Sequence, residues 1–204
     1  RCLRVPYNRG VMALLEIVRL GHPALRSQTS PVELSALSDP ALQQVIDDMV
    51  ETMHAAHGVG LAAPQVGLGL QLFVYQAESS GIPLRVVVNP LVTPLAGEPL
   101  FDWEGCLSIP DLRGLVPRHP AVKLAARDRH GEPFELVAED FEARIIQHEL
   151  DHLHGVIFLD RMRALQSLAY AQELEELYGE HAVDEVAEQR AAAAPEPAPG
   201  DDVA

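Results

Sequence analysis

Apolar and polar positions alternate along this chain with two different periods. Between residues 38 and 58, apolar residues recur every three or four positions, which is the period of an α-helix with one buried face. Ser38 or Asp39 would cap this helix, Pro40 fits its first turn, and Gly58 would end it. The apolar stripe is expected to pack in the core and consists of Leu42, Val45, Ile46, Met49, Val50 and Met53.

Further along, the pattern indicates strands. "LQLFVYQ" (70–76) and "LRVVVNP" (84–90) are typical of strands, and the polar turn around "ESSGIP" joins them. "AVKLAARDRHGEPFELVAED" predicts a β-hairpin that turns at His130-Gly131. A helical period returns over 140–154 and stops at Gly155, and residues 161–178 predict a final amphipathic helix. Helices mixed with antiparallel strands make the expected fold class α+β.

The two ends differ from the middle in composition. Residues 1–11 show no clear period, so we expect an N-terminal extension or an expression remnant. Residues 12–179 are expected to form one folded domain, while the acidic, Ala/Pro-rich stretch 180–204 is typical of a disordered tail. From Glu173 to the end there are ten acidic residues against the single Arg190.

Charge and cysteine content limit the class of protein. The net charge of −15 argues against direct nucleic-acid binding, which needs a basic face, and we expect no docking of the acidic tail on ribosomal RNA. No apolar run approaches the roughly 18 residues of a membrane span. Cys2 and Cys106 are too few for a disulfide framework. These features predict a cytoplasmic protein, and we expect a monomer.

One short motif suggests a metal site. In "ARIIQHELDHLHG", His148 and His152 are four residues apart and therefore lie on one face of a helix, with Glu149 beside them. Phe141 and Ile145 share this face, so we expect it to be buried. Two buried imidazoles without partners would cost about 1–3 kcal/mol each, and a metal ion would remove this cost. The motif alone also arises by chance, so it is suggestive only.

The third ligand is not obvious downstream. No suitable His or Glu follows His152, and Asp160 comes after what looks like a strand. Upstream, "DWEGCLSIP" places Cys106 in a Gly-flanked turn, with Pro110 expected to end the extended piece. A thiolate and two imidazoles would leave one coordination position open for water. A lone cysteine is more often a small buried hydrophobe, so this reading needs support from other motifs.

Three motifs together supply that support. "GVGLAAPQ" (58–65), "EGCLS" (104–108) and "HELDH" (148–152) occur in this order, and with them the chain resembles the peptide deformylase family from about Leu15 to Met162. The resemblance implies a peptide deformylase-like fold with a central metal-binding helix. It also implies an enzyme that removes the formyl group from the N-terminal formyl-methionine of nascent chains and releases formate.

The resemblance assigns roles to individual residues. It implies one divalent ion held by Cys106, His148 and His152, with Fe²⁺ preferred and Ni²⁺, Co²⁺ or Zn²⁺ as alternatives. Glu149 would act as general base and then general acid. The oxyanion would be bound by the side chain of Gln65 and the backbone N–H of Leu107, residues of the first two motifs.

The resemblance and the positions of the motifs also suggest which residues contact the substrate. Val59 and Ile145 are expected to form walls of the pocket for an unbranched apolar side chain, and Gly60 and Gly105 to contact the peptide. Arg113 would stand at the entrance. Arg118 and Glu104 are expected to form a supporting ion pair. Two alternatives remain open at this point: a metallopeptidase of the H-E-x-x-H type, and an inactive paralogue with a closed structural metal site.

Overall fold

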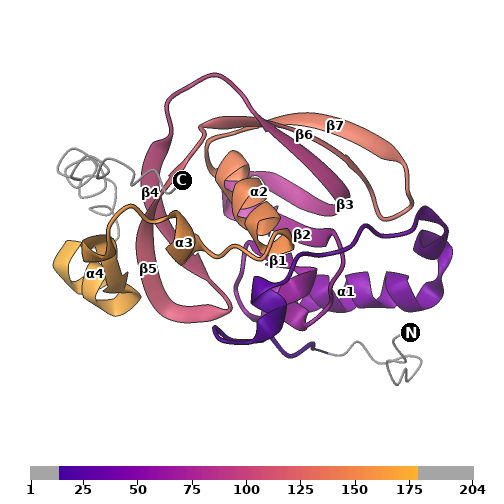
Figure 1. Cartoon of the computed structure of the whole chain (residues 1–204), viewed down its shortest axis with the longest axis horizontal. Helices are drawn as coiled ribbons and strands as arrows, with labels where there is room; N and C mark the ends of the chain where they lie inside the picture. The colour runs from indigo at the N-terminus through magenta and orange to yellow at the C-terminus, as the bar shows by residue number, and fades with distance from the viewer. Residues whose placement is uncertain (1–13, 179–204) are drawn as a thin grey trace, which may run out of the picture.

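The computed structural model describes residues 14–178, which form two antiparallel sheets with a central helix between them (Figure 1). The larger sheet has the order β1-β2-β3-β6-β7 and the smaller one the order β4-β5-β8. The strands of the larger sheet are β1 (Gly60–Ala62), β2 (Leu72–Ala77), β3 (Ile82–Pro94), β6 (Ala121–Arg127) and β7 (Pro133–Glu139). Those of the smaller sheet are β4 (Leu100–Cys106), β5 (Ile109–Arg118) and β8 (Leu168–Tyr170).

Four α-helices of the described residues accompany the sheets, and the α+β class is confirmed. They are α1 (Pro40–Ala55), α2 (Asp140–Leu153), α3 (Phe158–Arg161) and α4 (Ala171–Tyr178). Short 3₁₀ turns connect several elements: η1 (Pro23–Arg26), η2 (Leu34–Ser38), η3 (Ala63–Val66), η4 (Glu78–Ser80) and η5 (Leu165–Ser167). No described helix has the length and apolar character needed to cross a membrane.

The first helix and the two hairpins of the larger sheet form as predicted. Asp39 caps α1 by accepting a hydrogen bond from the N–H of Ala41 at 2.9 Å. Ile46, Met49 and Met53 from its apolar stripe are fully buried. The expected hairpins correspond to β2–β3 and β6–β7. In β6 and β7 every second residue is the more buried one, whereas residues 72–75 of β2 are buried on both faces.

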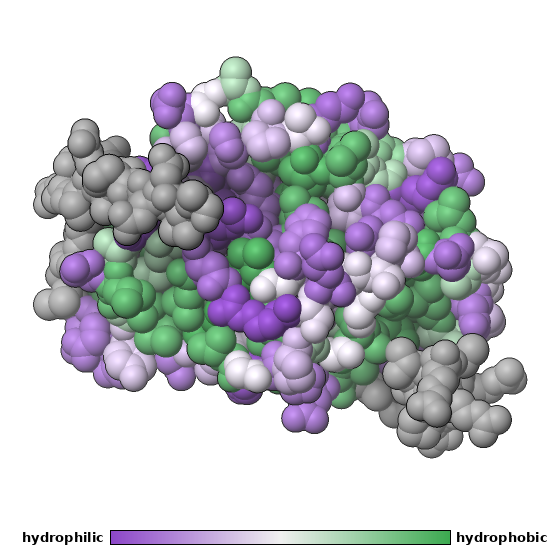
Figure 2. All heavy atoms as spheres, in the orientation of Figure 1, coloured by the Kyte–Doolittle hydropathy of each residue, from purple (hydrophilic) through white to green (hydrophobic). Residues whose placement is uncertain are grey.

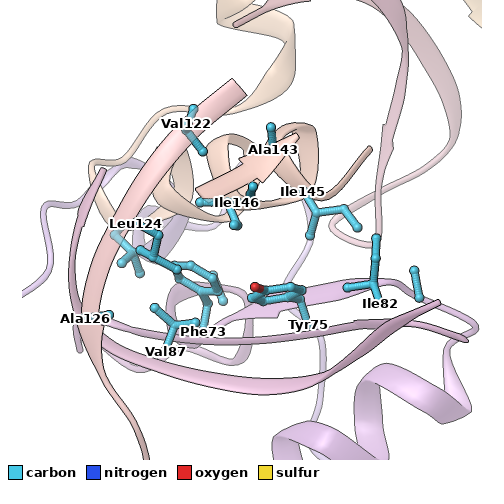
Figure 3. Close-up of a cluster of buried hydrophobic side chains, with 14 residues drawn as sticks. Phe73, Tyr75, Ile82, Val87, Val122, Leu124, Ala126, Ala143, Ile145 and Ile146 are labelled. Atoms are coloured by element: carbon cyan, nitrogen blue, oxygen red, sulfur yellow. The ribbon is translucent and has the colours of Figure 1, made fainter. Parts of the chain in front are cut away.

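One face of α2 packs on the larger sheet. Figure 3 shows Ile145 and Ile146 of the helix above Phe73 and Tyr75 of β2, with Leu124 of β6 beside them. All five side chains are buried, and the two aromatic rings lie 6.1 Å apart. This apolar contact fixes the helix over the sheet and leaves its opposite face directed toward β4 and β5 (Figure 1).

Three local predictions were wrong. Pro110 does not end an extended piece, because it lies inside β5, and Cys106 ends β4 at a tight turn. The expected helix 161–178 is divided into the end of α3, a 3₁₀ turn, the strand β8 and α4. This segment does not form one helix because residues 168–170 pair with 112–114 of β5. Asp160 accordingly lies in α3 and does not follow a strand.

The N-terminal part of the described chain follows the central elements in extended form. The backbone N–H of Val18 donates to the carbonyl of Gln65, and that of Leu20 donates to the carbonyl of Ser108. Apolar and polar areas are interspersed on the face that Figure 2 shows. The predicted segments 1–11 and 180–204 lie outside the described residues, so the expected domain boundaries stay predictions.

Candidate active site

Three side chains with metal-binding atoms converge between α2 and the β4–β5 hairpin. Cys106 ends β4, and His148 and His152 lie one turn apart on α2. Their ligand atoms are all within 4.8 Å of one another, and Sγ of Cys106 is 3.3 Å from Nε2 of His152. Tetrahedral bonds of about 2.3 Å to sulfur and about 2.0 Å to nitrogen would separate two such ligand atoms by roughly 3.5 Å. The donor set therefore fits one small divalent ion.

The electrostatics of these residues also suit a cation. Burial lowers the pKa of His152 well below its ordinary value, so this imidazole is neutral, as a metal ligand must be. Its buried Nδ1 has no hydrogen-bond partner among the described residues. Burial acts to lower the pKa of His148 too, but hydrogen bonds to Cys106 and Glu104 raise it well above the ordinary value. The acidic groups around His148 thus favour positive charge at this place, which a bound cation would supply instead of the proton.

A carboxylate orients the first histidine. Nδ1 of His148 is 2.9 Å from Oε2 of Glu104, so the other ring nitrogen is left to face Cys106. Arg118 donates to both oxygens of Glu104, at 2.8 and 3.0 Å, which gives the ion pair expected from the sequence. Burial acts to raise the pKa of Glu104, but the hydrogen bonds from His148 and Arg118 hold it well below the usual range. Such a carboxylate fixes the tautomer and the orientation of a metal-binding imidazole.

The Glu104–Arg118 pair belongs to a larger group, the buried charge cluster, which we define as Glu104, Arg118, Arg144, Asp151 and Arg161. The first four are buried, and Arg161 closes the cluster at the surface. Nη1 of Arg118 donates to Asp151 at 2.6 Å, and Arg161 donates to the other oxygen of Asp151 at 2.6 Å. Arg144 donates to Glu104 at 2.9 Å. The cluster therefore links β4, β5, α2 and α3 around the histidines.

Glu149 points into the same space as the ligands. Its side chain is buried, and Oε2 has no hydrogen-bond partner in the part of the chain that the structure describes. A Cβ at Gly60 would overlap the Glu149 carboxylate, so only a glycine in β1 allows this approach. Burial raises the pKa of Glu149 to about 7, although the charges of His148 and Arg118 act in the opposite direction. A carboxyl group with this pKa can both accept and return a proton near neutral pH.

The amide of Gln65 is fixed with its donor toward Cys106. Its Oε1 accepts the N–H of Ala62 at 2.7 Å, which directs Nε2 to the opposite side. Nε2 lies 3.4 Å from Sγ of Cys106 and 3.4 Å from the hydroxyl of Ser108. Gln65 and Ser108 are both fully enclosed. Leu107 lies between Cys106 and Ser108 in the β4–β5 turn and packs against Gly58. A Cβ at Gly58 would collide with the Leu107 side chain.

A cavity of about 570 Å³ opens onto these residues. Its size falls within the range of pockets that bind small ligands and peptides. Val59, Gly60, Gly105, Arg113 and Ile145, the predicted substrate contacts, all line it. The expectation that Phe141 is buried was wrong: 42% of it is exposed, because it lies at the start of α2 and lines the open side of the cavity.

Sequence reasoning missed several residues of the site. The Ser108 hydroxyl was available in the second motif, since it lies two residues after Cys106. Arg144 also had a signal, because it precedes His148 by one helical turn and therefore shares its face. Trp103 and Arg19 line the cavity without any recognisable pattern around them.

Comparison with known proteins gives a consistent result. Residues 14–168 match the model of the family described as polypeptide deformylase. A peptide deformylase 2 of Bordetella bronchiseptica is 43% identical over 165 residues, which covers 78% of this chain and 93% of the relative.

Solved structures agree with this match. A class I type b peptide deformylase from Acinetobacter baumannii with bound Met-Ala-Ser is similar with a TM-score of 0.69 and 35% identity, over 74% of this chain and 100% of the other. A peptide deformylase from Synechococcus elongatus in complex with actinonin has a TM-score of 0.68 and 39% identity, over 84% of this chain and 87% of the other.

Proposed function

Because this chain belongs to the polypeptide deformylase family, whose members are metal-dependent hydrolases, we propose that Cys106, His148 and His152 hold the ion with which it removes N-terminal formyl groups. The observation that carries the proposal is the convergence of these three ligand atoms next to the buried, unpartnered Oε2 of Glu149. The substrate is the formyl-methionyl end of a newly made polypeptide, and the products are formate and a free amino terminus.

The donor set leaves a catalytic coordination position. Among residues 14–178, the metal-binding group comprises three residues and not the four of a closed structural site. A thiolate with two imidazoles suits several first-row divalent ions, and we assign Fe²⁺ as the native one, with Ni²⁺, Co²⁺ and Zn²⁺ as substitutes. When bound, the ion would lower the pKa of a water molecule and polarise the formyl carbonyl.

Glu149 moves the proton. Its carboxylate takes a proton from the attacking water and later gives it to the leaving amine, for which its pKa of about 7 is suited. Gly60 is required here because it lets the carboxylate lie directly against the β1 backbone.

Gln65 and Leu107 stabilise the charge that develops on the carbonyl oxygen. The amide of Gln65 is already held by the N–H of Ala62, so its donor does not have to reorganise during the reaction. The backbone N–H of Leu107 is the second donor, from the turn next to Cys106. Fixed donors of this kind contribute more in an enclosed site than in water.

The peptide is held between two strand edges. β1 is an edge of the larger sheet and β4 an edge of the smaller one, and both line the cavity, through Gly60 and Gly105. An extended peptide can pair with such edges. The methionine side chain packs on Val59 and Ile145, and Arg113 stands at the entrance. The enzyme acts as a monomer in the cytoplasm, where nascent chains are made, without direct nucleic-acid contacts.

The test is release of formate from formyl-Met-Ala-Ser by the metal-loaded protein. We expect stoichiometric formate and free Met-Ala-Ser, and no cleavage between methionine and alanine. Peptide-bond cleavage without formate would indicate a metallopeptidase instead. Metal binding without either product would indicate a structural metal site.

A further inference from the structure

The three proposed ligands come from two elements that the chain does not join directly. Cys106 belongs to β4, whereas His148 and His152 belong to α2, and β5, β6 and β7 lie between them in sequence. A metal site functions only when its ligands are held within about 0.5 Å of the required geometry. Something other than chain connectivity must therefore fix the distance between α2 and the β4–β5 hairpin.

Arg144 makes contacts that can fix the distance between α2 and the β4–β5 hairpin. From α2, its Nη1 donates to the Val116 carbonyl of β5 and Nη2 to the Leu100 carbonyl of β4, both at 2.9 Å. Nη1 also donates to Oε1 of Glu104 at 2.9 Å. One side chain of the metal-binding helix thus reaches the backbones of both strands of the hairpin that carries Cys106.

The same guanidinium is connected to a ligand through one carboxylate. Glu104 accepts Arg144 at Oε1, and its Oε2 lies 2.9 Å from Nδ1 of His148. Arg144 and His148 are four residues apart on α2 and therefore stand one above the other on the same face. The contacts close a ring from the helix to the strand and back to the helix.

Arg118 does not duplicate these contacts. It joins the side chains of Glu104 and Asp151, and within the described chain its guanidinium donates to no backbone carbonyl. Arg144 is 8% exposed, so its donors face protein groups and not solvent. A planar guanidinium can hold several acceptors at fixed angles, whereas a lysine ammonium is a single flexible point charge.

We propose that Arg144 is a positioning residue for the metal site, which sets the spacing between Cys106 and the two histidines and holds Glu104 against His148. The inference rests on the metal site proposed above. It concerns the geometry and retention of the ion, and Arg144, which also lines the cavity, would act through Glu104 and the backbone of the hairpin. Loss of the guanidinium should therefore loosen the ligand set even while the protein stays folded.

The experiment compares Arg144→Met and Arg144→Lys with a matched control, Arg129→Met. Arg129 also bridges two elements, since it donates to the side chain and carbonyl of Gln43 in α1 from the β6–β7 turn, but it lies outside the site. Each protein is loaded with Co²⁺, and two signals are recorded: the visible cobalt–thiolate absorption and the rate of metal release to a chelator. Formate release then gives kcat and KM separately.

We expect Arg144→Met to release Co²⁺ at least tenfold faster, with shifted absorption bands and a kcat lowered about tenfold at a KM within threefold of the parent. Arg144→Lys should give a release rate and a kcat between those of the parent and those of Arg144→Met. It serves as the readout if the Met variant does not fold. Arg129→Met should keep the parental release rate and spectrum.

Parental release rates and spectra in both Arg144 variants would overturn the proposal. Equal acceleration in Arg129→Met would also overturn it, because general loosening would then explain the effect. These results differ from failure of the proposed function, in which the parent chain itself would show no cobalt–thiolate absorption or no change on Cys106→Ser.

Discussion

The two faces of α2 are held by opposite kinds of contact. Toward the larger sheet, Ile145 and Ile146 meet Phe73 and Tyr75 in an apolar layer (Figure 3). Toward the β4–β5 hairpin, the helix presents Arg144 and Asp151 of the buried charge cluster and the proposed ligand His148, with hydrogen bonds of 2.6–2.9 Å.

These two kinds of contact have different consequences: the apolar face mainly stabilises the fold, and the polar face mainly fixes the geometry of the site. Apolar contacts are non-directional and stabilise in proportion to the area they bury. A buried charge cluster contributes less net stability, because its desolvation offsets much of the attraction, but it allows only a few arrangements of its members. We therefore expect changes on the apolar face to alter the free energy of unfolding, and changes on the polar face to alter metal binding and turnover.

The largest expected effect is on turnover. Glu149→Gln removes the proton carrier and leaves all three proposed ligands in place. We expect formate release to fall about 10²–10⁴-fold, the usual contribution of a general acid–base group. Metal content should match the parent and is measured on the same samples. Near-parental turnover with full metal occupancy would rule out this role for Glu149.

The next effect is on metal binding. Cys106→Ser replaces a thiolate by a hydroxyl group that stays protonated at neutral pH. The affinity should fall by more than the roughly 10–100-fold that loss of a supporting hydrogen bond costs. Competition with a chelator measures this, and the melting temperature of the metal-free protein serves as control. Unchanged affinity would place Cys106 outside the ligand set.

A change on the apolar face should give the reverse result. Ile146→Ala creates a cavity under α2, and we expect it to lower the free energy of unfolding by about 2–5 kcal/mol. Denaturant unfolding of the metal-free protein measures this loss. The cobalt absorption of the folded variant should stay at the parental position. A shifted spectrum would show that the two faces are not separable.

The smallest expected effect is on the free energy of unfolding and concerns Asp160, at the edge of the polar region. Asp160 pairs with Arg26 and accepts the N–H of Ile157 at 2.9 Å. Burial acts to raise the pKa of Asp160, but the hydrogen bond from Arg26 and the Ile157 N–H lower it below its ordinary value. A lowered pKa stabilises the fold above the unfolded-state pKa of about 3.9, and this is lost as pH falls through the folded value.

Asp160→Asn should therefore cost less than about 1 kcal/mol at pH 7, since the pair is partly exposed. The difference between the two proteins should shrink as the pH falls below about 4. Urea unfolding at pH 7 and pH 3 measures both values. A difference that grows toward acid would contradict the assigned direction of the pKa shift.

The same contrast explains what the sequence could predict. The helices α1 and α2 and the hairpin β6–β7 have an apolar face with a regular period, and β2 and β3 contain short apolar runs, so local patterning was sufficient. β4 and β5 have no clear alternation, because "DWEGCLSIPDLRG" mixes two glycines, one proline and four charged residues. The strand β8 was predicted as helix because the leucines of the segment 161–178 fit a helical spacing, while its pairing with β5 depends on residues more than fifty positions away.

In the site, too, residues could be predicted from their own chemistry, but contacts between distant segments could not. Cys106, His148 and His152 could be named because their side chains carry distinctive chemistry, and the structure brings their ligand atoms together. The contacts of Arg144 could not be predicted, since they join a side chain to the carbonyls of Leu100 and Val116. Backbone acceptors leave no trace in the residue sequence.

The pairing of β8 with β5 also affects how the chain is synthesised. Arg118 ends β5 and Leu168 begins β8, so fifty residues must be added before the open edge of β5 meets its partner. At about 5–20 residues per second, this interval lasts roughly 3–10 seconds. During that time the segment after Cys106 offers unpaired N–H and C=O groups to other strands. The speed of translation thus sets how long an unfinished deformylase chain is open to wrong pairing.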